Sequence, residues 1–213
     1  MTPGQLDRVQ PTSDQPRIGN VYLLRGWIGI FSEGMNSLGQ TLNRSGVRTT
    51  VYQDDQWDQL ALTIRERYAK ADRREPLVLI GHSFGADDVL RMSRELRLAG
   101  ITVDLVITLD PVTPPQVPSN VRLCFNLYQS NGAWDTVPMF RGIPLKQEAG
   151  SPGQLQNIDV RKDRVDLLEP GTNHFNIEKN GKIHAEVLKQ VLTACPARPR
   201  ESVTHNWTSG SRN

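Results

Sequence analysis

The chain is poor in cysteine, in long apolar runs and in net charge. Its two cysteines, Cys124 and Cys195, are too few for a disulfide framework or a metal cluster, so we expect free buried thiols and no metal site. The 25 basic and 23 acidic side chains leave a net charge of +2, which gives no electrostatic reason to expect a nucleic-acid partner. The longest apolar stretches, VYLLRGWIGIF and PLVLIG, are too short to span a membrane.

The two ends of the chain have few apolar residues and are rich in Pro, Ser, Thr and Arg. Such segments bury too little apolar surface to offset the entropy of ordering. We therefore predict mobile segments at 1–17 and 196–213 around a single domain at 18–195. The start, MTPGQLDRVQPTSDQ, lacks the basic-then-apolar pattern of a signal peptide, so we expect a cytoplasmic location. The sequence leaves the oligomeric state open.

Short runs rich in Val, Ile and Leu alternate with longer amphipathic stretches, a pattern typical of a parallel sheet with crossover helices. We predict an α/β three-layer sandwich, with a mostly parallel sheet of about six strands and helices on both faces. The strands are expected at 21–26, 47–52, 77–81, 103–109, 121–128 and 165–168. The helices are expected at 36–42, 55–73, 86–98 and 183–194. Region 131–173 has little periodicity and is expected to be a long loop over one sheet edge.

The strongest motif is the pentapeptide GHSFG at 81–85, a G-x-S-x-G sequence that directly follows an apolar strand and precedes an amphipathic helix. The glycines allow a tight strand-to-helix turn that presents the Ser83 hydroxyl above the carboxyl edge of the sheet. The first N–H groups of the following helix favour negative charge at that point. Ser83 is thus a candidate nucleophile, and an ordinary serine in a glycine-rich turn is the alternative.

A serine hydroxyl needs a base to take its proton, and the chain has four histidines. His82 adjoins Ser83 and is expected to point away from its hydroxyl, His184 lies inside the expected last helix, and His205 lies in the tail. His174 remains. It lies in a polar, turn-rich loop on the same sheet edge as Ser83, so we predict that it is the base.

The carboxylate that orients the base is expected at the end of a strand between Ser83 and His174. Asp110 ends the apolar run DLVITL and precedes a proline, which cannot continue a strand ladder. Asp135, beyond the next strand, is the rival. Three later aspartates are expected on the solvated surface: Asp159, Asp163 and Asp166. Asp87 and Asp88, early in the helix after Ser83, are explained by favourable charge at a helix N-terminus.

These motifs, in the chain order Ser83, Asp110, His174, resemble the α/β-hydrolase superfamily from about residue 21 to 195. Compared with that family, the chain starts near the third strand, so we expect a sheet without the usual first hairpin. We also expect no sizeable lid, unless region 131–173 forms one. It implies an oxyanion hole made by the N–H groups of Phe84 and Trp27. The step at Asp110 resembles the acid-bearing strand end of pancreatic-type lipases, while most other members carry the acid one strand later.

The resemblance implies a serine hydrolase that cleaves a small-molecule carboxylic ester or thioester through an acyl-enzyme, with no cofactor. Ile28, Ile30, Phe31 and Phe175 either line an acyl pocket or only cover the core. Two alternatives remain: a non-catalytic binding protein with the same fold, and an acyltransferase that uses the same nucleophile.

Overall fold

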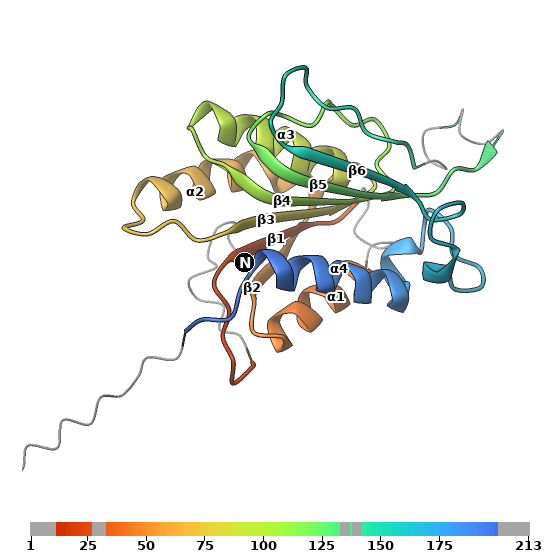
Figure 1. Cartoon of the computed structure of the whole chain (residues 1–213), viewed down its shortest axis with the longest axis horizontal. Helices are drawn as coiled ribbons and strands as arrows, with labels where there is room; N and C mark the ends of the chain where they lie inside the picture. The colour runs from red at the N-terminus through yellow and green to blue at the C-terminus, as the bar shows by residue number, and fades with distance from the viewer. Residues whose placement is uncertain (1–11, 27–32, 133–136, 138–141, 200–213) are drawn as a thin grey trace, which may run out of the picture.

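In the described part of the chain, the sheet has six strands, all parallel, in the order β2-β1-β3-β4-β5-β6 (Figure 1). The computed structural model describes residues 12–26, 33–132, 137 and 142–199. The strands are β1 (Asn20–Leu24), β2 (Arg48–Tyr52), β3 (Leu77–His82), β4 (Val103–Leu109), β5 (Val121–Tyr128) and β6 (Gln154–Asp159). The helices are α1 (Glu33–Arg44), α2 (Trp57–Ala69), α3 (Phe84–Leu98) and α4 (Gly181–Ala194), with short 3₁₀ turns η2 (Asp54–Gln56), η5 (Val165–Leu167) and η6 (Ile177–Lys179).

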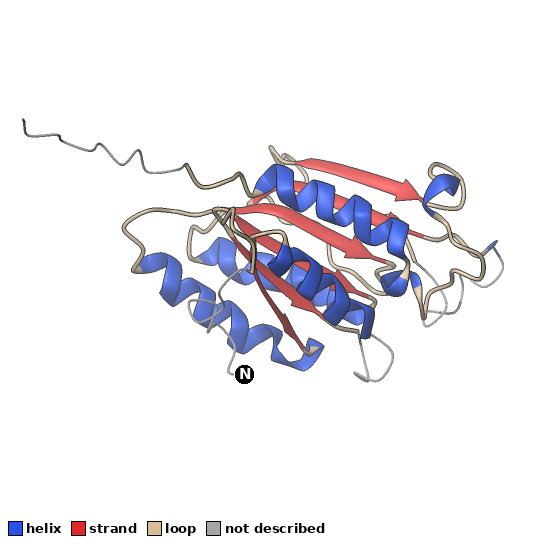
Figure 2. Ribbon diagram, turned by 90° about the horizontal axis from the view of Figure 1, so that it is seen from below, coloured by secondary structure: helices blue, strands red, loops and turns tan. Residues whose placement is uncertain are grey.

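Helices cover both faces of the sheet, as the apolar runs predict. Helices α1 and α4 lie on one face and α2 and α3 on the other (Figures 1 and 2). Alternate residues of each central strand supply the two cores: Val21 and Leu23 pack with α1 and α4, whereas Tyr22 and Leu24 pack with α2 and α3. This arrangement confirms the predicted α/β three-layer sandwich.

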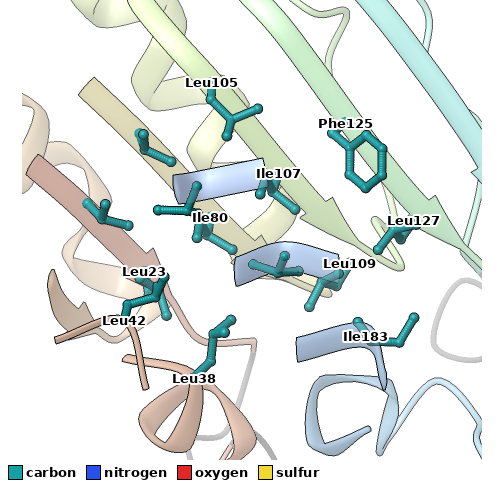
Figure 3. Packing of buried hydrophobic residues seen from close by; sticks show 14 of the residues in the cluster. Leu23, Leu38, Leu42, Ile80, Leu105, Ile107, Leu109, Phe125, Leu127 and Ile183 are labelled. Carbon is teal, nitrogen blue, oxygen red and sulfur yellow. The ribbon is translucent and has the colours of Figure 1, made fainter. Parts of the chain in front are cut away.

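The core beneath α1 and α4 consists of aliphatic side chains from several strands and both helices. Figure 3 shows Leu38 of α1 and Ile183 of α4 close to the side chains that project from β1, β3 and β4. These residues are at most 1 % exposed, so the central strands are fixed by burial on both faces. Such a sheet holds the ends of its strands, and the residues that follow them, in fixed positions.

Region 165–168 is not a strand, which corrects one expectation. It contains the 3₁₀ turn η5, and the last strand is β6, inside the region expected to be a long loop. The physical reason is that β6, with the sequence QLQNID, lies at the edge of the sheet and carries mostly polar, partly exposed side chains. It therefore has neither an apolar run nor an alternating pattern.

The residues just outside the expected domain, before 18 and after 195, contact each other in the structure. Arg17 and Ala197 form an antiparallel bridge, and the Arg17 guanidinium donates to the carbonyl oxygens of Leu192 and Cys195 at 3.0 and 2.9 Å. The boundaries at 18 and 195 stay predictions.

Both cysteines are buried and free. None of the helices in the described part of the chain has both the length and the apolar character needed to cross a membrane.

Candidate functional site

Ser83 lies in the turn between β3 and α3, with φ 56° and ψ −123°. The glycines of the motif are required by close backbone approach. A Cβ on Gly81 would lie 2.2 Å from the carbonyl oxygen of Gly85, and a Cβ on Gly85 would lie 2.3 Å from that of Arg25. The Ser83 N–H donates to the carbonyl of Leu109 at 2.9 Å, so the turn is bonded to the end of β4. This is the strand–turn–helix geometry that the motif predicts.

His174 reaches Ser83 from a loop between η5 and η6. Its Nε2 lies 3.1 Å from Ser83 Oγ, within hydrogen-bonding distance, although 91 residues separate the two along the chain. The His174 side chain is buried, with 4 % of the residue exposed. Asn173 shapes the loop locally, because its side-chain oxygen accepts the N–H of Phe175 at 2.9 Å and its own N–H donates to Asn176. The structure thus brings together the predicted nucleophile and base.

Asp110 lies on the other side of the His174 ring, directly after β4. Its Oδ2 is 3.5 Å from His174 Nδ1, and the aspartate is fully buried. Gln129, which follows β5, fixes this carboxylate with two bonds: its N–H donates to Oδ1 at 2.7 Å and its side-chain amide donates to Oδ2 at 3.0 Å. Gly142 packs so closely that a Cβ there would lie 2.1 Å from Oδ1.

Backbone strain is concentrated at this site. Among the described residues other than glycine, Ser83 and Asp110 are the two with positive φ, at 56° and 47°. Each conformation is uncommon for a residue with a Cβ, and each is bonded into the sheet, since the Asp110 N–H donates to Leu127 at 2.9 Å. Such outliers cluster at functional sites, where the surrounding structure fixes them.

Three further residues that support the site lack any sequence signal. His82 was expected only to point away from the Ser83 hydroxyl, and its Nε2 lies 2.9 Å from the carbonyl oxygen of His174. Gln129 and Gly142 have the contacts with Asp110 described above. Each is an ordinary residue type whose role depends on a partner distant in sequence, which a single sequence does not reveal.

Asp87 lies in the first turn of α3 as expected but has a further role, whereas the expectation that Asp159 is solvated surface is wrong. Asp87 is fully buried and accepts bonds from the N–H groups of Val112 and Thr113 at 3.0 and 2.8 Å, so it fixes the segment after Asp110 rather than only favouring a helix end. Burial raises its pKa. Asp159 is 2 % exposed and accepts the Ser130 hydroxyl at 2.5 Å. Burial raises its pKa, but hydrogen bonds from Ser130, Lys162 and the Arg161 N–H together outweigh this and lower it.

The remaining predicted residues divide into two groups. Phe84 starts α3 and is partly buried, and Phe175 is 40 % exposed with its ring edge-on to His174 at a centroid distance of 5.5 Å. The others lie outside the described residues: Trp27, Ile28, Ile30, Phe31 and the rival acid Asp135. Within the described ranges, no group of three or more His, Cys, Asp or Glu side chains is placed to hold a metal ion.

No protein-family model and no curated protein matches this chain. Several solved structures are similar to it in fold. Est1E from Butyrivibrio proteoclasticus is 14 % identical over 87 % of this chain and 91 % of its own, with a TM-score of 0.49. A cutinase-like protein from a Cryptococcus species is 14 % identical over 83 % and 94 %, with a TM-score of 0.46. A serine hydrolase without a lid from Xanthomonas campestris is 14 % identical over 89 % and 88 %, with a TM-score of 0.47.

At these identities and TM-scores the likenesses do not decide the function, which depends on the geometry of the site. The fold follows from the chain's own topology. The six described strands are parallel, the Ser83 turn joins a central strand to α3, and Asp110 and His174 follow later elements at the same sheet edge. The chain has the α/β-hydrolase fold, in a form whose described sheet lacks the first antiparallel hairpin.

Proposed function

We propose that the chain is a serine hydrolase that cleaves a carboxylic ester or thioester of a small molecule. The observation that carries this proposal is the 3.1 Å separation of Ser83 Oγ and His174 Nε2, with Asp110 behind the same imidazole. A nucleophile within hydrogen-bonding distance of a base, itself oriented by a third group, is the arrangement that activates a serine hydroxyl.

In this mechanism Ser83 Oγ attacks the acyl carbonyl while His174 Nε2 takes its proton. Asp110 Oδ2 faces Nδ1, so it favours the tautomer with the proton on Nδ1 and stabilises the imidazolium that forms. His174 then gives the proton to the leaving alcohol or thiol, and an acyl-enzyme remains on Ser83. Water attacks the acyl-enzyme with His174 as base, which releases the acid and restores the hydroxyl.

The oxyanion that forms in each step needs donors on the elbow side of the carbonyl. Phe84 is the first residue of α3, so its N–H lies at the helix N-terminus, the end that favours negative charge. Trp27, placed by family resemblance, would supply the second donor. Each such donor typically contributes about 3 kcal/mol to transition-state stabilisation.

The substrate would bind beside the exposed face of Phe175, which lies edge-on to the base. An exposed aromatic ring at this position suits an apolar acyl or alcohol group. Ile28, Ile30 and Phe31 are proposed to complete the acyl pocket. Esters and acyl thioesters of graded chain length would identify the preferred substrate.

Hydrolysis of p-nitrophenyl esters by single variants tests the proposal. Ser83→Ala should lose at least about 10⁴-fold in kcat, as serine hydrolases do without their nucleophile. Ser93→Ala is the matched control, because Ser93 is a buried serine whose hydroxyl donates to the backbone carbonyl of Val89 within α3. Full activity in Ser83→Ala would contradict the proposal.

The acid is tested in the same assay by two further variants. Asp110→Asn should lose about 10²–10⁴-fold in kcat, because an amide favours the wrong tautomer of the base. Asp135→Asn should stay near the wild-type rate. The opposite result would assign the acid to Asp135 and leave the nucleophile and base unchanged.

A further inference from the structure

We propose that His82 is a positioning residue for the base: its imidazole donates from Nε2 to the backbone carbonyl of His174 and holds the His174 ring where it reaches Ser83. The inference rests on the proposed function, since a positioned base matters only if Ser83 is activated. His82 is the last residue of β3 and is 3 % exposed. Its Nε2 lies 2.9 Å from the His174 carbonyl oxygen.

The charge state of His82 fits this role. Burial first, and then the nearby His174, lower the pKa of His82 to about 4, so the ring is neutral near pH 7. A neutral imidazole has one N–H, and a carbonyl oxygen can only accept, so the proton at this contact is on Nε2. A neutral His82 also adds no positive charge next to His174 when that ring becomes an imidazolium, although the ring centroids are only 5.6 Å apart.

The other anchor of the His174 ring is weak. Asp110 Oδ2 is 3.5 Å from Nδ1, beyond the usual hydrogen-bond range, and the buried Nδ1 has no hydrogen-bond partner among the described residues. The ring position therefore depends strongly on where the loop backbone places His174. A misplacement of about 1 Å at a reacting group can cost about 10²-fold in rate.

The position of His82 in the sheet makes it a rigid anchor. It pairs with Leu109 in the parallel register of β3 and β4, and the next residue is Ser83. Nucleophile and anchor are thus neighbours on one strand end. The bond from His82 therefore holds the His174 backbone at a fixed distance from the end of β3, which also carries Ser83.

His184 offers a matched control. It is a partly buried histidine whose pKa is lowered mainly by burial, and its Nε2 also contacts a backbone carbonyl, that of Glu178. Its bond joins α4 to η6 and does not involve His174. Loss of this bond should reduce stability without a specific effect on the chemical step.

The test compares His82→Gln with His82→Met. The two side chains are similar in length and shape, but only glutamine has a donor near the position of Nε2. On p-nitrophenyl acetate, His82→Met should lower kcat about 10- to 100-fold with KM within about threefold of wild type, while His82→Gln should recover kcat to within about fivefold of wild type. His184→Met should keep wild-type kcat.

Equal kcat for the methionine and wild-type proteins, or equal loss in both His82 variants, would overturn the inference. The ¹⁵N chemical shifts of His82 in the wild-type protein at pH 7 give a readout that needs no variant. The Nε2–H tautomer is expected, and an Nδ1–H tautomer or an imidazolium would also overturn the inference. A folded wild-type protein without esterase activity would instead contradict the proposed function, whatever the tautomer.

Discussion

Glu178→Gln should stabilise the protein at alkaline pH and much less at acid pH. Glu178 lies in η6, four residues after His174, and is fully buried. Among the described residues, no donor meets either carboxylate oxygen with good hydrogen-bond geometry. Burial is the main cause that raises the pKa of Glu178 to about 7, and the charge of Lys179 and nearby backbone N–H groups only partly oppose it.

The sign and size of the effect follow from the two states of the chain. Below pH 4.5, the usual pKa of this group, the carboxyl is protonated in both folded and unfolded protein and folding loses nothing. Above that pH the unfolded chain ionises first, so stability falls until the pH passes about 7, the folded value. At 1.36 kcal/mol per tenfold change, the full loss is about 3 kcal/mol as an upper bound.

The assay is urea unfolding of wild type and Glu178→Gln at pH 4.5 and pH 8.5, with thermal melts as a second measure. The stability difference between the two proteins should change by up to about 3 kcal/mol between these pH values, or roughly 6–12 °C in Tm for a chain of this size. Glu66→Gln, on the exposed face of α2, is the control and should show no such change. A stability difference that does not depend on pH would refute the reasoning.

Two further variants test the supports of Asp110. Asp87→Ala removes the acceptor of the Val112 and Thr113 N–H groups and should cost about 2 kcal/mol in urea unfolding, while an unchanged midpoint would show that these bonds add nothing. Gly142→Ala places a Cβ 2.1 Å from Asp110 Oδ1 and should lower kcat/KM at least about tenfold in the ester assay, and a wild-type rate would mean that the carboxylate position is not critical.

The sequence indicates five of the six described strands: four are mostly apolar, largely buried runs, and β2 has an alternating pattern. The run LVLI of β3, for example, is buried on both faces, and a short, fully apolar run of this kind is typical of a central parallel strand. Strand β6 is not predicted, because an edge strand with mostly polar side chains resembles a loop in sequence. The helix boundaries shift by a few residues, as with α1, which begins at Glu33 rather than near residue 36.

The three central side chains of the candidate site can be found from the sequence because of their places in the topology. Residues that follow the carboxyl ends of parallel strands meet at one sheet edge, so Ser83 and Asp110 were expected to lie together, and elimination among the histidines selected His174. The residues that support them could not be found this way. His82 and Asp87 bond distant backbone groups, and Gln129 donates to the distant Asp110 carboxylate, so none of them leaves a local pattern.

The most direct test of the central claim is the mass of the folded protein after treatment with a fluorophosphonate, followed by peptide mapping. Such probes react with an activated serine and leave a covalent adduct. A single adduct on the peptide that contains Ser83, absent from Ser83→Ala and present in Ser93→Ala, is the predicted result. A folded wild-type protein that gains no mass, or an adduct that persists in Ser83→Ala, would contradict the assignment of Ser83 as the nucleophile.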